Sequence, residues 1–215
     1  MRAHFALLLV LAAAAPALAD GHNEVLIGSF DRAMHASSAN AVTSESLGGM
    51  VLGYAHELDL GLLPKLQTWA TAGFSWGGAN GTMFSTLTTE IDALSFTLGG
   101  RARYEVFSHI AVGARLDLGT ARAALTLREG DRQLSDSGWG GTTTAATSAD
   151  LLAYAGPAFK LGFRFELGYT MTSAIPLAPS EAKDPSQNHL QMSQASLGHL
   201  DLGGRFVSFT AISQF

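Results

Sequence analysis

The 215-residue sequence predicts an all-β protein, an antiparallel up-and-down transmembrane β-barrel of about eight strands. Three features support this fold class. Apolar and polar residues alternate with a period of two in successive segments, short and long links follow these segments in turn, and the alternation continues to the C-terminal Phe215. Because successive side chains of a strand point to opposite faces, such segments give a wall with one apolar and one polar face.

The N-terminus predicts export. Arg2 and His4 precede an apolar run that ends in the small-x-small sequence Ala-Leu-Ala at residues 17–19, which is typical of a cleaved secretory signal peptide. The run is too short for a membrane-spanning helix, which needs roughly 20 apolar residues. We therefore expect a signal peptide over residues 1–19 and a β-barrel domain over residues 20–215.

The composition excludes several classes of protein. The chain has no cysteine, so an exported domain cannot rely on disulfides or on thiol chemistry. Charged residues make up 14%, against roughly 25% in an ordinary soluble domain. A net charge of −5 without a clustered basic patch argues against nucleic-acid binding.

The strands are expected from the alternation. In residues 94–105, Leu94, Phe96 and Leu98 share one face, whereas Arg101 and Arg103 share the other. Residues 109–119 and 163–172 repeat this arrangement, and weaker versions occupy residues 25–32, 46–57, 65–76, 148–160 and 196–215. An even number of strands places both termini on one side of the barrel.

The links between these strands alternate in length. Long polar links are expected over residues 33–45, 77–89, 128–146 and 176–195, and short ones around residues 60–64, 107–108 and 161–162. Short turns at one rim and long loops at the other are typical of membrane barrels. Ten strands remain an alternative, since weak periodicity over residues 82–89 or in the last segment could hide another pair.

The C-terminal segment carries a resemblance to a known family. Val207, Phe209, Ala211 and Phe215 share one parity, from which Ser213 departs. This resembles the last-strand signal that the barrel-assembly machinery recognises, and residues 24–215 resemble a small bacterial outer-membrane β-barrel of the outer membrane protein A or W type, without the peptidoglycan-binding domain.

The resemblance implies location in the outer membrane, contact with its lipid and lipopolysaccharide, and assembly by that machinery. It also implies that Phe215 faces lipid on the closing strand. The register of that strand stays open, because residues 197–206 also resemble a final strand and residues 207–215 would then be an extension.

The charged residues of the strands are expected to point into the lumen. An arginine that faces lipid near the midplane costs about 2–4 kcal/mol. An eight-stranded barrel is just wide enough for side chains to fill it, so opposite charges would form a paired plug. The alternative is a narrow ion-selective passage. The expected lumen residues are Arg101, Arg103, Glu105, Arg115, Asp117, Arg164, Glu166, Asp201 and Arg205.

Arg122 does not fit this scheme. It shares the parity of Leu116 and Leu118, which would make it face lipid. We expect either a bulge over residues 119–124 or a strand that has already left the bilayer at this point.

The aromatic residues suggest interfacial girdles. Six of them lie near expected strand ends or on outward faces: Tyr54, Trp69, Trp76, Tyr104, Tyr154 and Tyr169. Trp139 lies in an expected long loop, where it would anchor the loop or touch a ligand.

No catalytic, cofactor or metal site is expected. The histidines form neither HxH nor HxxxH spacing, and GxSxG and HExxH are absent. Only His35 and Ser37 show the His-x-Ser spacing of lipid A deacylases, with no acidic partner in view.

The sequence therefore favours a non-enzymatic barrel with a structural or surface-interaction role. One alternative is a narrow porin-like channel or passive transporter of small molecules. A second is a soluble exported lipocalin-like barrel, in which the apolar face would point inward around a ligand.

Overall fold

The computed structural model describes residues 22–34, 43, 46–61, 63–83, 87–130, 132–156, 159–179 and 198–215. The expected signal peptide and the His-x-Ser pair at residues 35–37 lie outside these ranges. The described residues form eight long strands: β1 (Asn23–Met34), β2 (Leu47–Leu58), β3 (Leu66–Met83), β4 (Leu87–Phe107), β5 (Ile110–Glu129), β6 (Arg132–Ala155), β7 (Lys160–Thr172) and β11 (Gly204–Gln214).

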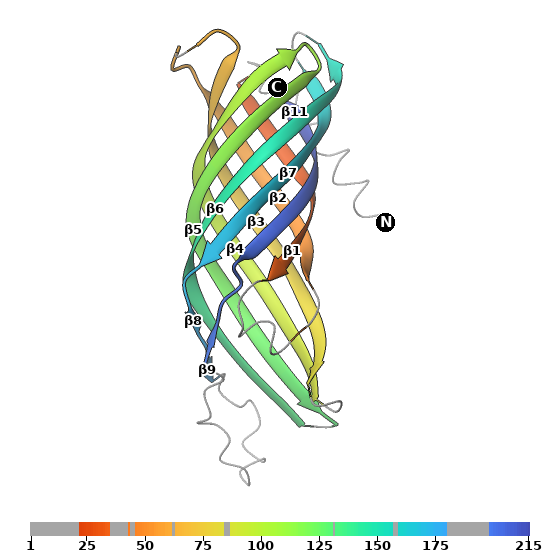
Figure 1. The fold of residues 1–215 in the computed structure, drawn as a ribbon, viewed down its shortest axis with the longest axis vertical. Coiled ribbons are helices and arrows are strands. Elements are labelled where there is room, and N and C mark those ends of the chain that lie inside the picture. Colours follow the sequence, from red (N-terminus) through yellow and green to blue (C-terminus); the bar gives the residue numbers. More distant parts are fainter. Residues whose placement is uncertain are drawn as a thin grey trace.

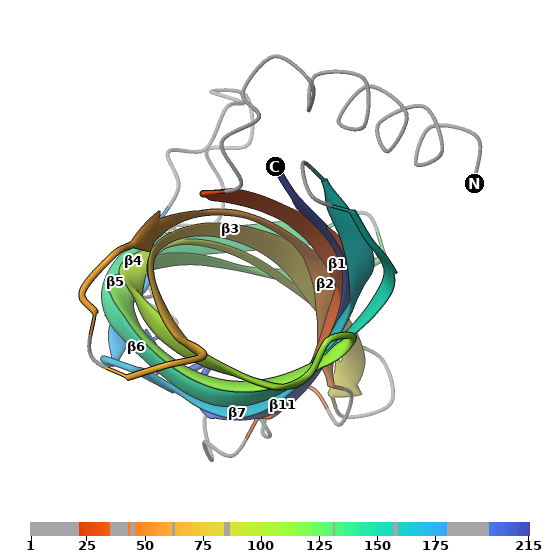
Figure 2. The same cartoon turned by 90° about the horizontal axis from the view of Figure 1, so that it is seen from above.

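These eight strands close into a ring, as Figure 2 shows. Each pairs antiparallel with its neighbour in the sequence, and β1 pairs with β11 from Glu24↔Gln214 to Met34↔Gly204. Two backbone hydrogen bonds of 2.9 Å between Asn23 and Phe215 complete the closing pair. The expected fold class and the count of eight strands in the wall are confirmed, and the last strand runs over residues 204–214.

The wall is much taller on one side. Strands β3 to β6 have 18, 21, 20 and 24 residues, whereas β1, β2, β7 and β11 have 12, 12, 13 and 11. In Figure 1 the β3–β4 and β5–β6 hairpins extend beyond the rest of the ring at the end opposite the C-terminus. We call this the hairpin end, and the end that carries Asn23 and Phe215 the short-turn end.

Two expected long loops are therefore wrong. Residues 77–83 continue β3 and 87–89 begin β4, while β5 and β6 meet at a turn that contains Gly130 at φ +57°. The glycine, serine and threonine content of these stretches suggested loops. Those residues instead occupy extended, paired strands, in which Asn80 and Gln133 are exposed whereas Thr89, Thr142 and Thr144 are buried. Residues 82–83 and 87–89 belong to β3 and β4 and form no additional strand pair.

The expected bulge near Arg122 is also wrong. The β4–β5 register runs without interruption from Thr88↔Arg128 to Glu105↔Ala111. Trp139 lies within β6, opposite Arg122, rather than in a loop. The expected turn at residues 161–162 is part of β7, and the turn between β6 and β7 is closed instead by a 2.9 Å hydrogen bond from Gly156 N to Phe159 O.

Three short strands lie at the hairpin end. β8 (Ile175–Pro176) pairs with β10 (His199–Leu200), and β9 (Ala178–Pro179) pairs with β6. Among the described residues there is no helix long and apolar enough to cross a membrane.

The contact between β1 and β11 predicts a sensitive position. A Cβ at Gly28 would lie 2.1 Å from the Phe209 carbonyl oxygen, whereas a Cβ at Gly48 would meet nothing within 4 Å. We expect Gly28→Ala to destabilise the barrel by about 1–3 kcal/mol through overpacking. Gly48→Ala should leave the stability nearly unchanged. The free energy of unfolding in detergent tests both variants, and equal stability would contradict the tight closing contact.

Candidate functional site

The lumen near the short-turn end holds a cluster of opposite charges. Four arginines and four carboxylates point inward, so that the formal charges cancel. We call these residues the lumen charge cluster: Glu24, Arg101, Arg103, Arg115, Asp117, Asp150, Arg164 and Glu166.

Glu24 is the centre of this cluster. Its carboxylate accepts hydrogen bonds from the Arg164 guanidinium at 2.7 and 3.0 Å and from Arg101 at 2.6 Å. The Gln214 amide, on the strand that closes the ring, donates a further bond of 2.8 Å to the same carboxylate. Glu24 thus links β1, β4, β7 and β11 across the lumen.

Asp150 extends the cluster to β6. The Arg164 guanidinium donates to both of its carboxylate oxygens, at 2.7 and 2.8 Å. Arg103 Nε lies 3.1 Å from the same carboxylate, and its Nη1 donates to Gln67 Oε1 at 2.9 Å. Arg164 therefore forms two bidentate pairs, the geometry that makes charge-assisted hydrogen bonds strong.

Arg115 forms the second half of the cluster, one step nearer the hairpin end. It donates to both Glu166 oxygens, at 3.0 and 3.1 Å, and pairs with Asp117. Thr71 donates to Asp117 at 2.7 Å, and Ser208 donates to Glu166 at 3.1 Å. Each buried charge thus has partners that offset the cost of removing it from water.

Trp69 covers one side of the cluster, and this corrects its expected place in an outer girdle. The indole is 2% exposed, and the Arg101 guanidinium carbon lies 5.2 Å from its ring centre. The odd residues of β3 face inward, so Trp69 has the phase of Gln67 and Thr71.

Six of the expected lumen residues are in the cluster, and three are not. Glu105 is half-buried near the short-turn end and forms no ion pair with any described residue. Asp201 lies between β10 and β11, where its carboxylate accepts hydrogen bonds from Thr172 at 2.5 Å and from Gly203 N at 2.7 Å.

Arg205 faces outward, so its expected place in the lumen is wrong. It is exposed and has the phase of Val207 and Phe209 on β11. It lies one residue from the start of the strand, and near the edge of a bilayer an outward arginine costs only about 0–1 kcal/mol.

Sequence reasoning missed Glu24 and Asp150, the two carboxylates that hold Arg164. Glu24 lies one residue before the expected start of the first strand, so its phase was not considered. Asp150 has the phase of Ser148 and Leu152 in a weakly alternating segment. Extending the alternation of the first strand by one residue would have found Glu24, and applying the alternation within residues 148–160 would have found Asp150.

Above the cluster, toward the hairpin end, the lumen becomes apolar. Side chains from the strands pack there against Ile175, Leu177, Leu200 and Leu202, which belong to the chain segments between β7 and β11. We call this the apolar plug; its other buried members are Met34, Leu47, Ala79, Ile91, Ala121, Ala123 and Leu125.

Glycines of β6 make room for the segment that enters the barrel mouth. A Cβ at Gly138 would lie 1.9 Å from the Pro176 carbonyl oxygen, and one at Gly140 would lie 2.8 Å from the Ile175 side chain. Between the plug and the charge cluster there is a cavity of about 60 Å³, lined by serine and threonine side chains together with charged residues (Arg32, Arg115 and Glu166) and phenylalanines. Side chains and inserted backbone thus fill the lumen at two levels.

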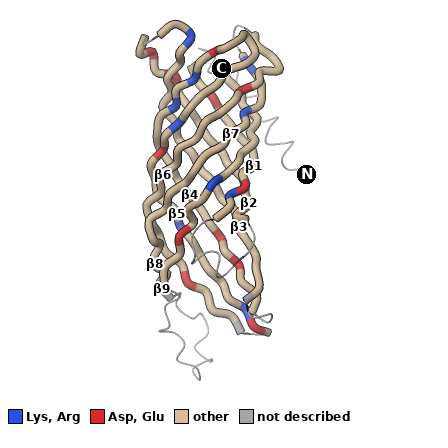
Figure 3. The backbone as a smooth tube through the Cα atoms, in the orientation of Figure 1, with Lys and Arg blue, Asp and Glu red and all other residues tan. Residues whose placement is uncertain are grey.

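The outer face has the opposite pattern. Between Tyr104 and Leu94 the outward residues of β4 and its neighbours are largely apolar. At about 3.3 Å per residue and a tilt of about 45°, these ten residues rise about 23 Å, close to the roughly 25 Å band of membrane barrels. The exposed apolar residues include Phe96, Leu98, Leu116, Leu118, Phe163, Phe165, Leu167 and Phe209. Figure 3 shows Lys, Arg, Asp and Glu as scattered positions along strands that are otherwise uncharged.

The polarity of the outer face and that of the inner face both change at the same row of paired residues in the wall. On the outside, the paired row Trp76, Leu94 and Arg122 ends the apolar band, and polar residues follow toward the hairpin end. On the inside, their chain neighbours Ser75, Ser95 and Ala121 lie where polar side chains give way to the apolar plug. We call this level the polarity switch.

The terminal aromatic departs from its expected position. Phe209 is 55% exposed on the outer face, but Phe215 is only 6% exposed. Phe215 follows the last residue of β11, beyond the point where the regular alternation ends. Tyr54, Trp76, Tyr104, Tyr154 and Tyr169 are exposed, as are Val207 and Trp139.

No protein-family model matches the sequence, and no curated protein matches it. The structure is similar to the crystal structure of Ail, the attachment invasion locus protein of Yersinia pestis, with a TM-score of 0.51 and 11% identity over 90% of this chain and 98% of that chain. The fold is that of a small outer-membrane β-barrel. The expected resemblance is thus confirmed at the level of the fold.

Two further structures complete the comparison. Ail in complex with the heparin analogue sucrose octasulfate gives a TM-score of 0.50 at 10% identity, over 89% of this chain and 97% of that chain. The translocator domain of the autotransporter NalP from Neisseria meningitidis gives 0.41 at 12% identity, over 98% of this chain and 68% of that chain.

The described residues contain no group of three or more His, Asp or Glu side chains placed to hold a metal ion. The chemistry that the charge cluster supports is mutual neutralisation within a narrow barrel.

The cluster predicts a large effect at Glu24. In Glu24→Ala, Arg101 and Arg164 lose their shared carboxylate in a buried site, and we expect a loss of about 3–5 kcal/mol in the free energy of unfolding. The matched control is Glu105→Ala, which should change it by less than about 0.5 kcal/mol. Urea unfolding in detergent or lipid measures both. Comparable losses in the two variants would contradict the central role of Glu24.

Proposed function

We propose that this protein is a non-enzymatic outer-membrane β-barrel with a structural or surface-interaction role, exported through a signal peptide cleaved after residue 19. The polarity switch is the observation that carries this proposal. A wall that is apolar outside and charged inside over about 23 Å, and then polar outside and apolar inside, fits a protein that leaves the bilayer at that level.

The tall hairpin side supports the surface role. Beyond the polarity switch, β3 to β6 continue as a sheet whose outer face carries polar residues, among them Asn80, Asp92, Arg128 and Gln133. The apolar plug holds the inner side of this sheet rigid. Such an extension presents a fixed surface to an external partner.

The filled lumen argues against the channel alternative. An ion would have to pass both the lumen charge cluster, in which each charge is paired, and the apolar plug. The exposed apolar band argues against a soluble lipocalin-like barrel, in which the outer wall would be polar.

Membrane insertion and conductance test the proposal together. We expect the protein to require detergent, to shift its gel mobility on boiling, and to give no unitary conductance after insertion into planar bilayers. Regular conductance steps from the inserted barrel would favour the channel, and release from the periplasm without detergent would favour the soluble binding barrel.

We also propose that the C-terminal residues Val207, Phe209, Ala211 and Phe215 direct assembly by the barrel-assembly machinery. In Phe209→Ala, which removes a side chain that is 55% exposed on the outer wall, the amount of assembled barrel in the outer membrane should fall severalfold, while refolding into detergent stays nearly unchanged, because the side chain acts in recognition. Equal assembly of the variant and the wild-type protein in cells would overturn this assignment.

A further inference from the structure

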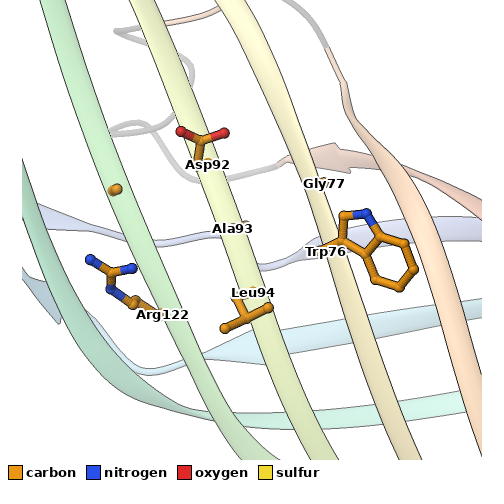
Figure 4. A pocket seen from close by; sticks show the side chains of 7 residues that line it. Trp76, Gly77, Asp92, Ala93, Leu94 and Arg122 are labelled. Atoms are coloured by element: carbon orange, nitrogen blue, oxygen red, sulfur yellow. The ribbon is translucent and has the colours of Figure 1, made fainter.

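A hollow of about 260 Å³ lies on the outer wall at the polarity switch. Figure 4 shows Trp76, Leu94 and Arg122 on three neighbouring strands, with Asp92 farther along the strand of Leu94 and the Trp76 ring directed away from Arg122. We call this the outer-wall hollow; it is lined by Trp76, Gly77, Asp92, Ala93, Leu94, Arg122 and Ala124. It lies on the outside of the wall and shares no residue with the lumen charge cluster, while its Ala93 also packs against the apolar plug.

Arg122 is the cation of this hollow. It is exposed on the outer face and donates a hydrogen bond of 3.2 Å to the Ser137 hydroxyl. It forms no ion pair with any carboxylate among the described residues, whereas Arg128, six residues nearer the hairpin end on β5, pairs with Glu90 at 3.4 Å. A guanidinium has five donors in a planar fork, so Arg122 has donors left for an anion.

Two exposed indoles lie in the same row of the wall as the arginine: Trp139 is its direct partner on β6, and Trp76 lies beyond Leu94, two strands away. Trp76, Leu94, Arg122 and Trp139 are successive partners across β3, β4, β5 and β6, and both tryptophans are exposed. One row nearer the short-turn end, the rings of Phe74 and Phe96 pack 4.9 Å apart on the apolar band. An anionic headgroup at Arg122 would therefore have its acyl chains on an aromatic surface.

Asp92 narrows the choice of ligand. It lines the same hollow and is exposed, so a ligand must offer a hydrogen-bond donor as well as an anion. A free phosphate has no apolar part for the Phe74–Phe96 surface. A phosphorylated sugar headgroup has phosphate for Arg122, hydroxyl or amide donors for Asp92, and acyl chains for the wall.

We propose that the outer-wall hollow binds the phosphorylated sugar headgroup of an outer-leaflet glycolipid, with Arg122 on the phosphate and Asp92 on a sugar hydroxyl or amide. This rests on the proposed outer-membrane location, because the hairpin end then lies at the cell surface. The site would hold the barrel at a fixed depth and orient the β3–β6 extension.

Binding of lipid A to the full-length barrel in detergent tests the proposal. Native mass spectrometry would compare bisphosphorylated lipid A, dephosphorylated lipid A and phosphatidylglycerol for the wild-type protein, Arg122→Gln and the control Arg128→Gln. We expect bisphosphorylated lipid A to bind most tightly, Arg122→Gln to weaken it about tenfold, the loss expected for one charge-assisted contact, and Arg128→Gln to leave it unchanged.

Three results would overturn the site. These are equal lipid A binding by Arg122→Gln and the wild-type protein, equal binding of the dephosphorylated or phospholipid ligands, and displacement by inorganic phosphate at the concentration of the lipid. A heat-modifiable, detergent-requiring barrel that gives any of these results would retain the proposed function and lose only this site. A protein that is soluble without detergent would lose both.

Discussion

Closure of the wall between β1 and β11 leaves this barrel without a free edge and gives it a lumen only wide enough for side chains. Every inward residue of eight strands must then pack against inward residues from the opposite wall. This constraint explains why Glu24, at the very start of β1, contacts residues of β4, β7 and β11. It also explains why the charges of the lumen charge cluster lie in pairs between different strands.

The same narrow ring must satisfy two surroundings along its axis. Over the apolar band, hydrocarbon outside requires apolar side chains there, and the inner face is left to hold polar groups. Beyond the polarity switch, water outside allows polar residues on the outer face, and the inner face can then pack as an ordinary hydrophobic core. The alternation of apolar and polar residues continues through both regions. What changes is the face that carries the apolar residues, which is the outer face along the apolar band and the inner face beyond the polarity switch.

Much of the fold could be predicted from this alternation. The strands around Phe96, Leu118 and Phe165 lie where expected, because an apolar outer face and a charged inner face give a strong period-two signal. The hairpin ends of β3 to β6 could not be predicted in the same way. There the outer face carries Gly, Ser, Thr and Asn, residues that are also typical of loops, and pairing with the neighbouring strand is what makes them extended.

Residues of the lumen charge cluster could be predicted where the alternation of apolar and polar residues was strong enough to show which face of the strand points inward. Arg101, Arg103, Arg115 and Arg164 lie in strong alternation and point inward. Arg122 and Arg205 show the limit of a rule based on charge alone, because both face outward near the edge of the apolar band. Trp69 shows the same limit for aromatics, since its environment depends on Arg101 of the adjacent strand. Long-range pairs such as Glu24 with Arg164 depend on the closure of the ring, which no local pattern contains.

A spin-label scan of β4 tests the polarity switch most directly. The chain has no cysteine, so single cysteines at residues 88–105 can each carry a nitroxide in the reconstituted protein. We predict that labels at even positions from 94 to 104, on the apolar band, are accessible to oxygen. Labels at even positions from 88 to 92, beyond the polarity switch, should be accessible to a water-soluble nickel complex. Labels at odd positions face the lumen and should be protected from both reagents. Nickel access at the even positions between 96 and 102, or oxygen access at the odd ones, would contradict the account.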